Sequence, residues 1–324
     1  MPLLGGLLLN RMTGVLAVGV AGYLVLCIAV FMLQRSLIYA PLRTRALPAA
    51  EAGFAPGKCH DLRCQTDDGL SLNGWLLLRS AAPAAEPRDV LKRLGDGAPV
   101  VLYFGGNGGN RSRRLDPMEV LSSFGAHVVL FDHRGYGDNP GRPSEERISA
   151  DAQSIWKVLT GRLGIAPGRI VIYGESLGGG IATRLAADVC RAGQEPRGLI
   201  LQSTFTSLAA AGQRIYWFLP VKWLLVDRYE SVKRLPDVTC PILQLHGRND
   251  QIVPLDLGQR LFEAAPAKSR GDIAPRQVIL ERTNHNDVYR VERDRVLAAL
   301  QEFLQIIEPG AESRVPSERR GDRQ

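Results

Sequence analysis

The chain has 324 residues, a length that accommodates one large enzyme domain together with additional segments. Its formal net charge of +7 raises the question of a nucleic-acid partner, but the lysines and arginines are scattered and several arginines lie in the last dozen residues. We therefore expect no nucleic-acid binding. The five cysteines form no CxxC pair and no cysteine–histidine spacing of a zinc site, so the sequence implies neither a metal nor another cofactor.

An apolar segment lies near the N-terminus. Residues 12–34 contain no charged side chain, and the run is about as long as a helix needs to cross roughly 30 Å of hydrocarbon. A cleaved signal peptide has a shorter apolar region, of about 7 to 15 residues, that ends in a small-residue cleavage site. Here the run leads directly into Arg35. We predict that residues 1–45 form a retained, single-pass membrane anchor, although too few charges flank the run to assign its orientation.

Beyond the anchor, short β-rich runs alternate with helical patterns, as in a mostly parallel sheet with helices on both faces. The first two runs are joined by a Thr-Asp-Asp-Gly turn and are expected to form a hairpin. The later runs are nearly continuously apolar, as burial on both faces requires. The eight predicted strands cover residues 60–65, 70–78, 99–104, 126–131, 169–173, 198–202, 241–246 and 276–281.

Helical patterns fill the gaps between these strands, and the last has apolar residues near the 3.6-residue period. The Ala- and Pro-rich residues 80–98 are expected to form a surface insertion, and the polar residues 308–324 a disordered tail. Residues 46–307 then form the catalytic domain. Cys59 and Cys64 are near in sequence, which leaves open whether they form a disulfide. The predicted helices cover residues 145–163, 177–191, 255–265 and 287–307.

Residues 174–178, Gly-Glu-Ser-Leu-Gly, match the G-x-S-x-G elbow, in which a strand turns sharply into a helix and exposes a serine hydroxyl. The match is weak alone, because glycine and serine are common residues. Its context favours the elbow over an ordinary strand-to-helix turn. An Ile-Val-Ile-Tyr run precedes it, and three consecutive glycines allow the following helix to pack closely. Ser176 is therefore the predicted nucleophile.

A serine at its free pKa needs a base, and proteins with this elbow carry the serine, the acid and the histidine in that order. Only His246 and His285 follow Ser176, and His246 ends a predicted strand. This leaves His285 as the predicted base, with a solvated loop histidine as the alternative.

Asp250 is the predicted acid, because it lies in the loop after a strand. Its carboxylate is expected to hold the imidazole of His285 in the productive tautomer and to stabilise the imidazolium. Asp256 and Asp287 are its main rivals, although either could instead cap a helix.

Acyl transfer also needs N–H donors aimed at the negative charge that develops on the carbonyl oxygen. In proteins with this elbow, one donor is the residue after the nucleophile, and the other lies in the loop after the third strand. These positions predict the backbone N–H groups of Leu177 and Asn107, the latter in the glycine-rich loop, residues 105–110. Such a loop can also bind phosphate, but neither nucleotide-binding pattern, G-x-G-x-x-G nor the P-loop, occurs in it.

Taken together, these segments resemble the membrane-anchored α/β-hydrolases related to the alpha/beta-hydrolase-domain-containing depalmitoylases and lysophospholipid lipases, in the serine aminopeptidase-like hydrolase superfamily. The resemblance covers most of the chain and implies an α/β-hydrolase fold that cleaves esters or thioesters. One departure is Gly105, where that group commonly has histidine, and this puts the hydrogen bonding of the loop in question. Besides the elbow and the loops named above, the resemblance rests on residues 34–39 (Gln-Arg-Ser-Leu-Ile-Tyr), 132–137 (Asp-His-Arg-Gly-Tyr-Gly) and 204–208 (Thr-Phe-Thr-Ser-Leu).

The expected substrate class follows from the membrane anchor and from an apolar segment that is expected near the site. Residues 215–226, Ile-Tyr-Trp-Phe-Leu-Pro-Val-Lys-Trp-Leu-Leu-Val, are expected either to bind an acyl chain at the mouth of the site or to form a core helix with a turn at Pro220. We predict a serine hydrolase of lipid-like esters or thioesters that acts through an acyl-enzyme. Two alternatives stay open: an aminopeptidase-like peptidase, which needs an acidic pocket and a lid, and a catalytically silent membrane-tethered binding protein. Nothing in the sequence indicates the oligomeric state.

Overall fold

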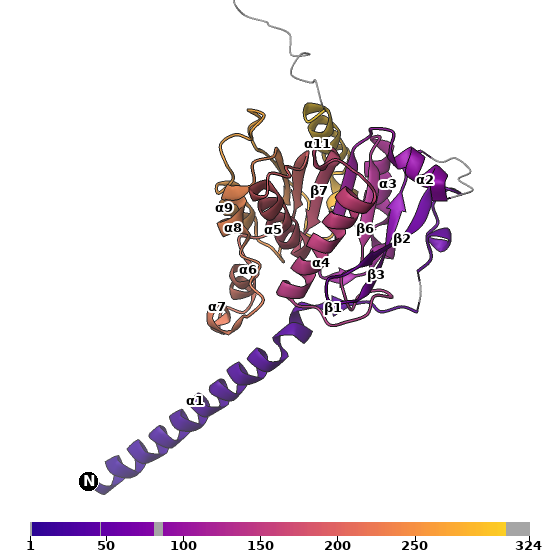
Figure 1. The fold of residues 1–324 in the computed structure, drawn as a ribbon. Helices are drawn as coiled ribbons and strands as arrows, with labels where there is room; N and C mark the ends of the chain where they lie inside the picture. Colours follow the sequence, from indigo (N-terminus) through magenta and orange to yellow (C-terminus); the bar gives the residue numbers. More distant parts are fainter. Residues whose placement is uncertain (1, 46, 81–86, 309–324) are drawn as a thin grey trace, which may run out of the picture.

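The computed structural model describes residues 2–45, 47–80 and 87–308 of the chain (Figure 1). At its centre lies an eight-stranded sheet of order β10-β9-β8-β7-β4-β6-β3-β2, in which β2, β3 and β6 pair antiparallel and the other pairs are parallel. All eight predicted strands are confirmed, each within two residues of its predicted ends. The strands are β2 (Cys59–Gln65), β3 (Ser71–Leu77), β4 (Val100–Phe104), β6 (His127–Phe131), β7 (Ile170–Glu175), β8 (Gly198–Gln202), β9 (Ile242–Gly247) and β10 (Arg276–Leu280).

Helices cover both faces of the sheet, as predicted (Figure 1). In β4, Val100, Leu102 and Phe104 pack on the side of α4 and α5, whereas Val101 and Tyr103 pack on the side of α3 and α11. Because alternate side chains enter two different cores, the central strands are apolar at nearly every position. The bounds of these helices are α3 (Leu115–Ser123), α4 (Glu145–Lys157), α5 (Leu177–Arg191) and α11 (Arg293–Ile306).

The predicted helices are present with differences at their ends. α5 has the predicted bounds, and α4 is continued by a π-helical turn, Val158–Arg162. α9 is shorter than predicted, at Leu255–Phe262. The helix predicted over residues 287–307 is broken into α10 (Val288–Val291) and α11. The break falls at Glu292, whose carboxylate accepts hydrogen bonds from the backbone N–H of Arg282 at 2.7 Å and from the hydroxyl of Thr283 at 2.9 Å.

Three short helices lie between β8 and β9, and they correct one interpretation of the sequence. They are α6 (Leu208–Ile215), α7 (Val221–Leu224) and α8 (Ser231–Arg234). Residues 215–226 do not form a core helix, because α6 ends at Ile215 and Trp217 and Trp223 are 79% and 88% exposed. This segment lies instead beside the N-terminal helix.

The helix expected to cross a membrane is present as α1 (Pro2–Ile38), a candidate span that projects from the body of the molecule (Figure 1). Its part Arg11–Ile38 is long and apolar enough to cross a membrane, with a mean hydropathy of 2.6 in its most apolar window. A two-residue strand, β1 (Ala40–Pro41), follows and pairs in parallel with β5 (Gly108–Gly109) of the glycine-rich loop.

The sequence also predicted a surface insertion and a C-terminal tail, and it left a disulfide open. The predicted surface insertion contains α2 (Pro87–Leu94), and its residues 81–86 lie outside the described residues, as does nearly all of the predicted tail. Cys59 and Cys64 are both free thiols. They lie five positions apart on β2, which places them on opposite faces and about 16 Å apart along the strand, too far for a disulfide.

Arg134, in the loop after β6, joins the β2–β3 turn to α4 and generates a stability prediction. Its guanidinium is 1% exposed and binds Asp151 of α4 at 2.8 Å and Asp68 of the turn at 2.7 Å. Burial raises the pKa of Asp151, and the hydrogen bond from Arg134 opposes this shift. Arg134→Met is expected to leave a buried carboxylate without its cation and to cost about 3–5 kcal/mol, measured by denaturant unfolding in detergent.

The matched control is Lys157→Met, which removes an exposed ion pair with Asp67 between the same turn and α4. This change is expected to shift the unfolding midpoint little, because exposed pairs contribute little. Equal shifts for the two variants would contradict the role given to Arg134.

Candidate active site

The elbow holds Ser176 in a strained conformation between β7 and α5. Its φ is +52° and its ψ is −115°, a combination that residues other than glycine rarely adopt. The backbone N–H of Ser176 donates to the carbonyl of Gln202 at 2.8 Å, and the hydroxyl of Thr204 donates to the carbonyl of Ser176 at 2.9 Å. Both partners come from the end of β8 or just beyond it, so the neighbouring strand fixes the elbow.

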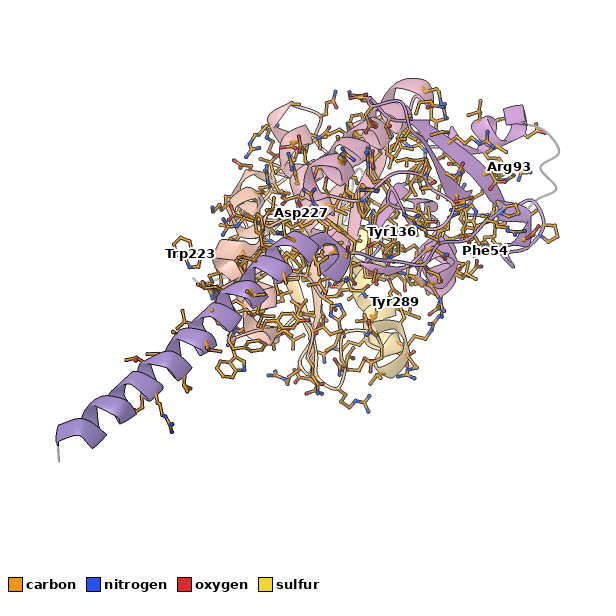
Figure 2. All side chains as sticks on the ribbon, turned by 90° about the horizontal axis from the view of Figure 1, so that it is seen from below. Phe54, Arg93, Tyr136, Trp223, Asp227 and Tyr289 are labelled. Carbon is orange, nitrogen blue, oxygen red and sulfur yellow. The ribbon has the colours of Figure 1, made fainter. Side chains whose placement is uncertain are left out.

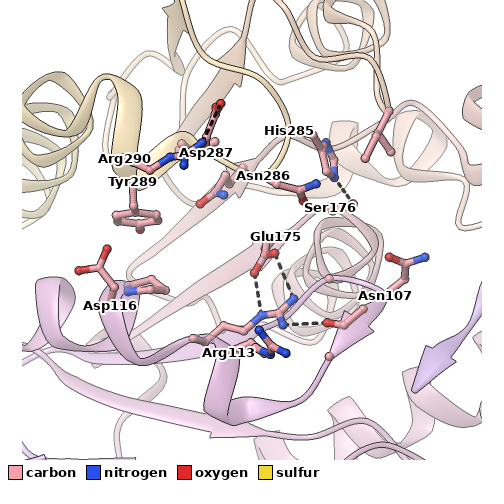
Figure 3. Close-up of a pocket in the computed structure, with 18 of the residues that line it drawn as sticks. Asn107, Arg113, Asp116, Glu175, Ser176, His285, Asn286, Asp287, Tyr289 and Arg290 are labelled. Carbon is pink, nitrogen blue, oxygen red and sulfur yellow. Dashed lines mark hydrogen bonds and ion pairs between the residues drawn. The ribbon is translucent and has the colours of Figure 1, made fainter. Parts of the chain in front are cut away.

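The three predicted triad residues come together at the carboxyl edge of the sheet, where His285 lies between Ser176 and Asp250. Figure 3 shows His285 facing Ser176. Nε2 of His285 lies 3.0 Å from Oγ of Ser176, and Nδ1 of His285 lies 2.7 Å from Oδ2 of Asp250. The other carboxylate oxygen of Asp250 accepts the backbone N–H groups of Ile252 and Val253 at 2.9 and 2.7 Å. The carboxylate is therefore held in place from one side while it orients the imidazole from the other.

The alternative candidates for the acid and the base bind partners other than Ser176 and His285. Asp256 is in the first turn of α9 and pairs with Arg214. Asp287 precedes α10, and its carboxylate accepts the backbone N–H of Asn284 at 2.7 Å. His246 is fully buried beneath the Asp250 loop, where its Nε2 lies 2.8 Å from the carbonyl of Val253 and burial lowers its pKa.

The two predicted oxyanion donors flank Ser176. Leu177 is the first residue of α5, and Asn107 lies in the glycine-rich loop facing the elbow (Figure 3). Among the described residues, neither backbone N–H donates to another group of the protein. An added Cβ at Gly106 would lie 3.5 Å from Cβ of Ser176, so the loop passes directly over the predicted nucleophile. Both N–H groups are thus free to bind an oxygen brought to Ser176.

Two residues of the segment 132–137 support this loop, although no role for either was predicted from the sequence. Nε2 of His133 lies 3.0 Å from the carbonyl of Gly105, and the hydroxyl of Tyr136 donates to the carbonyl of Asn107 at 2.9 Å. Burial lowers the pKa of His133 to about 4, so its imidazole is neutral and donates from Nε2. In the sequence, only the Asp-His-Arg-Gly-Tyr-Gly pattern marked these two residues. The pattern does not indicate that they contact the glycine-rich loop.

At position 105 this chain has glycine where the hydrolases that it resembles commonly have histidine, and Arg114 lies beside this glycine. A Cβ at Gly105 would lie 3.2 Å from Nε of Arg114, whose guanidinium occupies the adjacent space. Arg114 forms two 3.1 Å contacts with Glu175 of the elbow and donates to the carbonyl of Gly108 at 2.8 Å. Arg114, His133 and Tyr136 therefore supply part of the hydrogen bonding of the loop.

Two cavities meet at Ser176. The larger, of about 980 Å³, has a mixed lining, and we call it the polar cavity because the charged side chains of Arg113, Glu175 and Asp287 border it (Figure 3). The smaller, of about 350 Å³, is apolar and runs between α1 and α6. Among the described residues, no cluster of three or more histidine, cysteine, aspartate or glutamate side chains is arranged to hold a metal ion.

Comparison with known proteins identifies the family. Residues 99–213 match the model of the alpha/beta hydrolase fold family. An uncharacterized protein of Mycobacterium tuberculosis is 37% identical over 271 residues, which cover 84% of this chain and 87% of that protein. The chain belongs to the α/β-hydrolase family. It is therefore a hydrolase, with the fold that the sequence predicted.

More distant relatives carry a named activity. The chain is 34% identical to the lysophosphatidylserine lipase ABHD12 of Danio rerio over 230 residues, 65% of this chain and 60% of that protein. It is 32% identical to the Rattus norvegicus protein of the same name over 270 residues, 76% of this chain and 66% of that protein. The chain thus spans about three fifths to two thirds of these two relatives.

Solved structures support the fold. An esterase of Pyrococcus furiosus superimposes with a TM-score of 0.60 at 18% identity, covering 83% of this chain and 97% of the esterase. At this identity the likeness concerns the fold alone.

The contact of Tyr136 with the loop generates a prediction. Tyr136→Phe removes one hydrogen bond from the carbonyl of Asn107 and is expected to lower kcat for ester hydrolysis by about 10- to 100-fold, because small misplacements of reacting groups are costly. KM is expected to change little, since Tyr136 does not border the polar or the apolar cavity. An unchanged kcat in a normally folded variant would contradict this positioning role.

Proposed function

We propose that the protein is a membrane-anchored serine hydrolase that cleaves carboxylic ester or thioester bonds through Ser176, His285 and Asp250. The observation that carries the proposal is the position of His285 between the other two residues, with hydrogen-bonding distances of 3.0 and 2.7 Å. Family membership and the lipase relatives independently support the hydrolysis of esters or lipids.

The reaction follows from the arrangement of these groups. Oγ of Ser176 attacks the acyl carbonyl carbon, and Nε2 of His285 takes the hydroxyl proton as Asp250 stabilises the imidazolium. The negative charge that forms on the carbonyl oxygen is stabilised by the N–H groups of Leu177 and Asn107. When the intermediate collapses, the alcohol or thiol leaves with the proton of His285, and an acyl-enzyme remains. Water, activated by His285, then releases the acid and restores Ser176.

The substrate that fits best is an amphiphile with an acyl chain and a polar, anionic headgroup. Acyl and polar portions can occupy the apolar and the polar cavity at the same time, because both cavities reach Ser176. Arg113 borders the polar cavity and has no acidic partner among the described residues, so it is available for an anionic group. The lysophosphatidylserine lipase activity that names the relatives fits this arrangement, and we propose a single-chain phospholipid-like ester as the substrate class.

Residues 1–45 supply the proposed single-pass anchor through α1, and residues 46–307 carry the proposed catalytic domain. The peptidase alternative has less support. Among the described residues, three acidic side chains border the polar cavity, and each has a partner. Glu175 binds Arg114, and Asp116 binds Arg293. Asp287 accepts the backbone N–H of Asn284 and lies 3.9 Å from Arg290.

The proposal is tested by hydrolysis of a short p-nitrophenyl ester. Ser176→Ala is expected to lower kcat by about 10⁶-fold, the scale for loss of such a nucleophile. Asp250→Asn is expected to cost about 10⁴-fold, because the imidazole would be held in the wrong tautomer. Asp256→Asn is the control and is expected to cost little, since its carboxylate pairs with Arg214 on α6. Full activity in Asp250→Asn would overturn the assignment of the acid, and full activity in Ser176→Ala would overturn the mechanism.

A further inference from the structure

One face of α1 packs against the catalytic body over several turns. Tyr23, Cys27, Val30, Gln34 and Ile38 follow the three- and four-residue spacing of a single helical stripe. Cys27 and Val30 belong to a small apolar cluster with residues 219–225. The amide of Gln34 bonds the backbone of the same segment twice, to the carbonyl of Leu224 at 3.2 Å and to the N–H of Val226 at 2.7 Å. One face of the second half of the proposed span therefore contacts the folded body, and its other faces are exposed.

An ion pair between a half-exposed arginine and a buried carboxylate lies near the end of this contact. Arg35, the first charge after the uncharged run, binds the carboxylate of Asp227 at 3.1 and 3.2 Å, and Tyr39 donates to the same carboxylate at 2.9 Å. Asp227 is 2% exposed and lies against the last turns of α1 (Figure 2). Two apolar segments distant in sequence, residues 12–34 and 215–226, thus end at the same ion pair.

Residues 215–226, which we call the apolar tip, project away from the sheet beside α1 (Figures 1 and 2). Lys222 is the one charged residue in this stretch of sequence. Clustered exposed aromatic and aliphatic side chains of this kind mark an interaction surface, and tryptophan and tyrosine are enriched where proteins meet the membrane interface. The exposed members are Ile215, Tyr216, Trp217, Phe218, Trp223 and Val226.

The contact between the apolar tip and α1 indicates how deep the tip would lie in a bilayer. The hydroxyl of Tyr23 donates to the carbonyl of Phe218 at 2.9 Å. Tyr23 precedes Arg35 by twelve residues, about 18 Å along a helix. When the uncharged run crosses a hydrocarbon layer of roughly 30 Å, this contact lies within the layer. A bilayer that holds α1 therefore also covers the tip.

The apolar cavity joins this surface to the nucleophile. Val30 and Leu37 of α1 form one wall, Tyr216 of the tip lies on another, and Ser176 is at the inner end. Leu37 and Tyr216 are 67% and 51% exposed, so the cavity opens at the surface between α1 and the tip. An acyl chain in the bilayer can reach Ser176 through this opening without passing through water.

We propose that the apolar tip inserts into the bilayer and that the acyl chain of a membrane lipid enters laterally between the tip and α1, with α1 as a wall of the acyl site. This inference rests on the proposed function, since it assumes that Ser176 attacks an acyl ester. It assigns to α1 a binding role in addition to anchoring.

The wall is tested with the full-length protein in phosphatidylcholine vesicles, by the ratio of p-nitrophenyl palmitate to p-nitrophenyl butyrate turnover. Val30→Trp places a large side chain in the cavity and is expected to lower this ratio by about tenfold, since hydrophobic pockets discriminate by size. Ile28→Trp is the matched control, because Ile28 is exposed on another face of the same helix. An unchanged ratio in Val30→Trp, or an equal fall in both variants, would overturn the assignment of the wall.

Insertion of the tip is tested without any activity. The protein has four tryptophans, and Trp75 and Trp156 are buried in the catalytic body. Vesicles that contain dibrominated phosphatidylcholine are expected to quench the emission of the wild type, and the Trp217→Phe/Trp223→Phe variant is expected to lose most of this quenching. Equal quenching of the two proteins would overturn insertion. Because this measurement needs no turnover, a failed hydrolase proposal and a failed insertion proposal are distinguished.

Discussion

The active site depends on the close packing of α5 against the ends of β4, β7 and β8. A Cβ at Gly174 would lie 2.6 Å from Cα of Gly179, and one at Gly178 would overlap the carbonyl of Phe104. Glycine at these positions lets the helix begin directly at the sheet edge, which forces Ser176 to its positive φ. The parallel strands end at this edge, so the loops that carry Asp250, His285 and Asn107 reach Ser176 there.

The N-terminal segment completes the site from the opposite side. A glycine-rich loop has few side chains to fix it, and its backbone groups need partners. The segment after α1 supplies several, because β1 pairs with Gly108 and Gly109 and the side-chain amide of Asn107 donates to the carbonyl of Ile38 at 2.9 Å. The same loop carries the proposed oxyanion donor Asn107. Helix α1, the glycine-rich loop and Ser176 therefore form one connected structure, and removing α1 together with β1 would remove support from the loop.

The sequence predicted the features whose signals are local. Buried strands are short and continuously apolar, and the glycines around Ser176 have a fixed spacing, so the strands and α5 could be placed within two residues of their ends. Chain order and elimination led to His285, and the position of Asp250 in the loop after a strand favoured it over Asp256 and Asp287. The partners of residues far apart in sequence were not predictable. The contact of α1 with residues 216–229, the support of Gly105 by His133 and the break at Glu292 each depend on a group that becomes a neighbour only in the folded chain.

The most direct test of the central claim is the site of covalent modification by a fluorophosphonate. This reagent requires an activated serine, and peptide mass spectrometry locates its adduct. The account predicts stoichiometric modification of Ser176, and loss of that modification in His285→Ala because the base is missing. Modification of a different serine, or an unmodified Ser176 in folded, membrane-reconstituted protein, would contradict it.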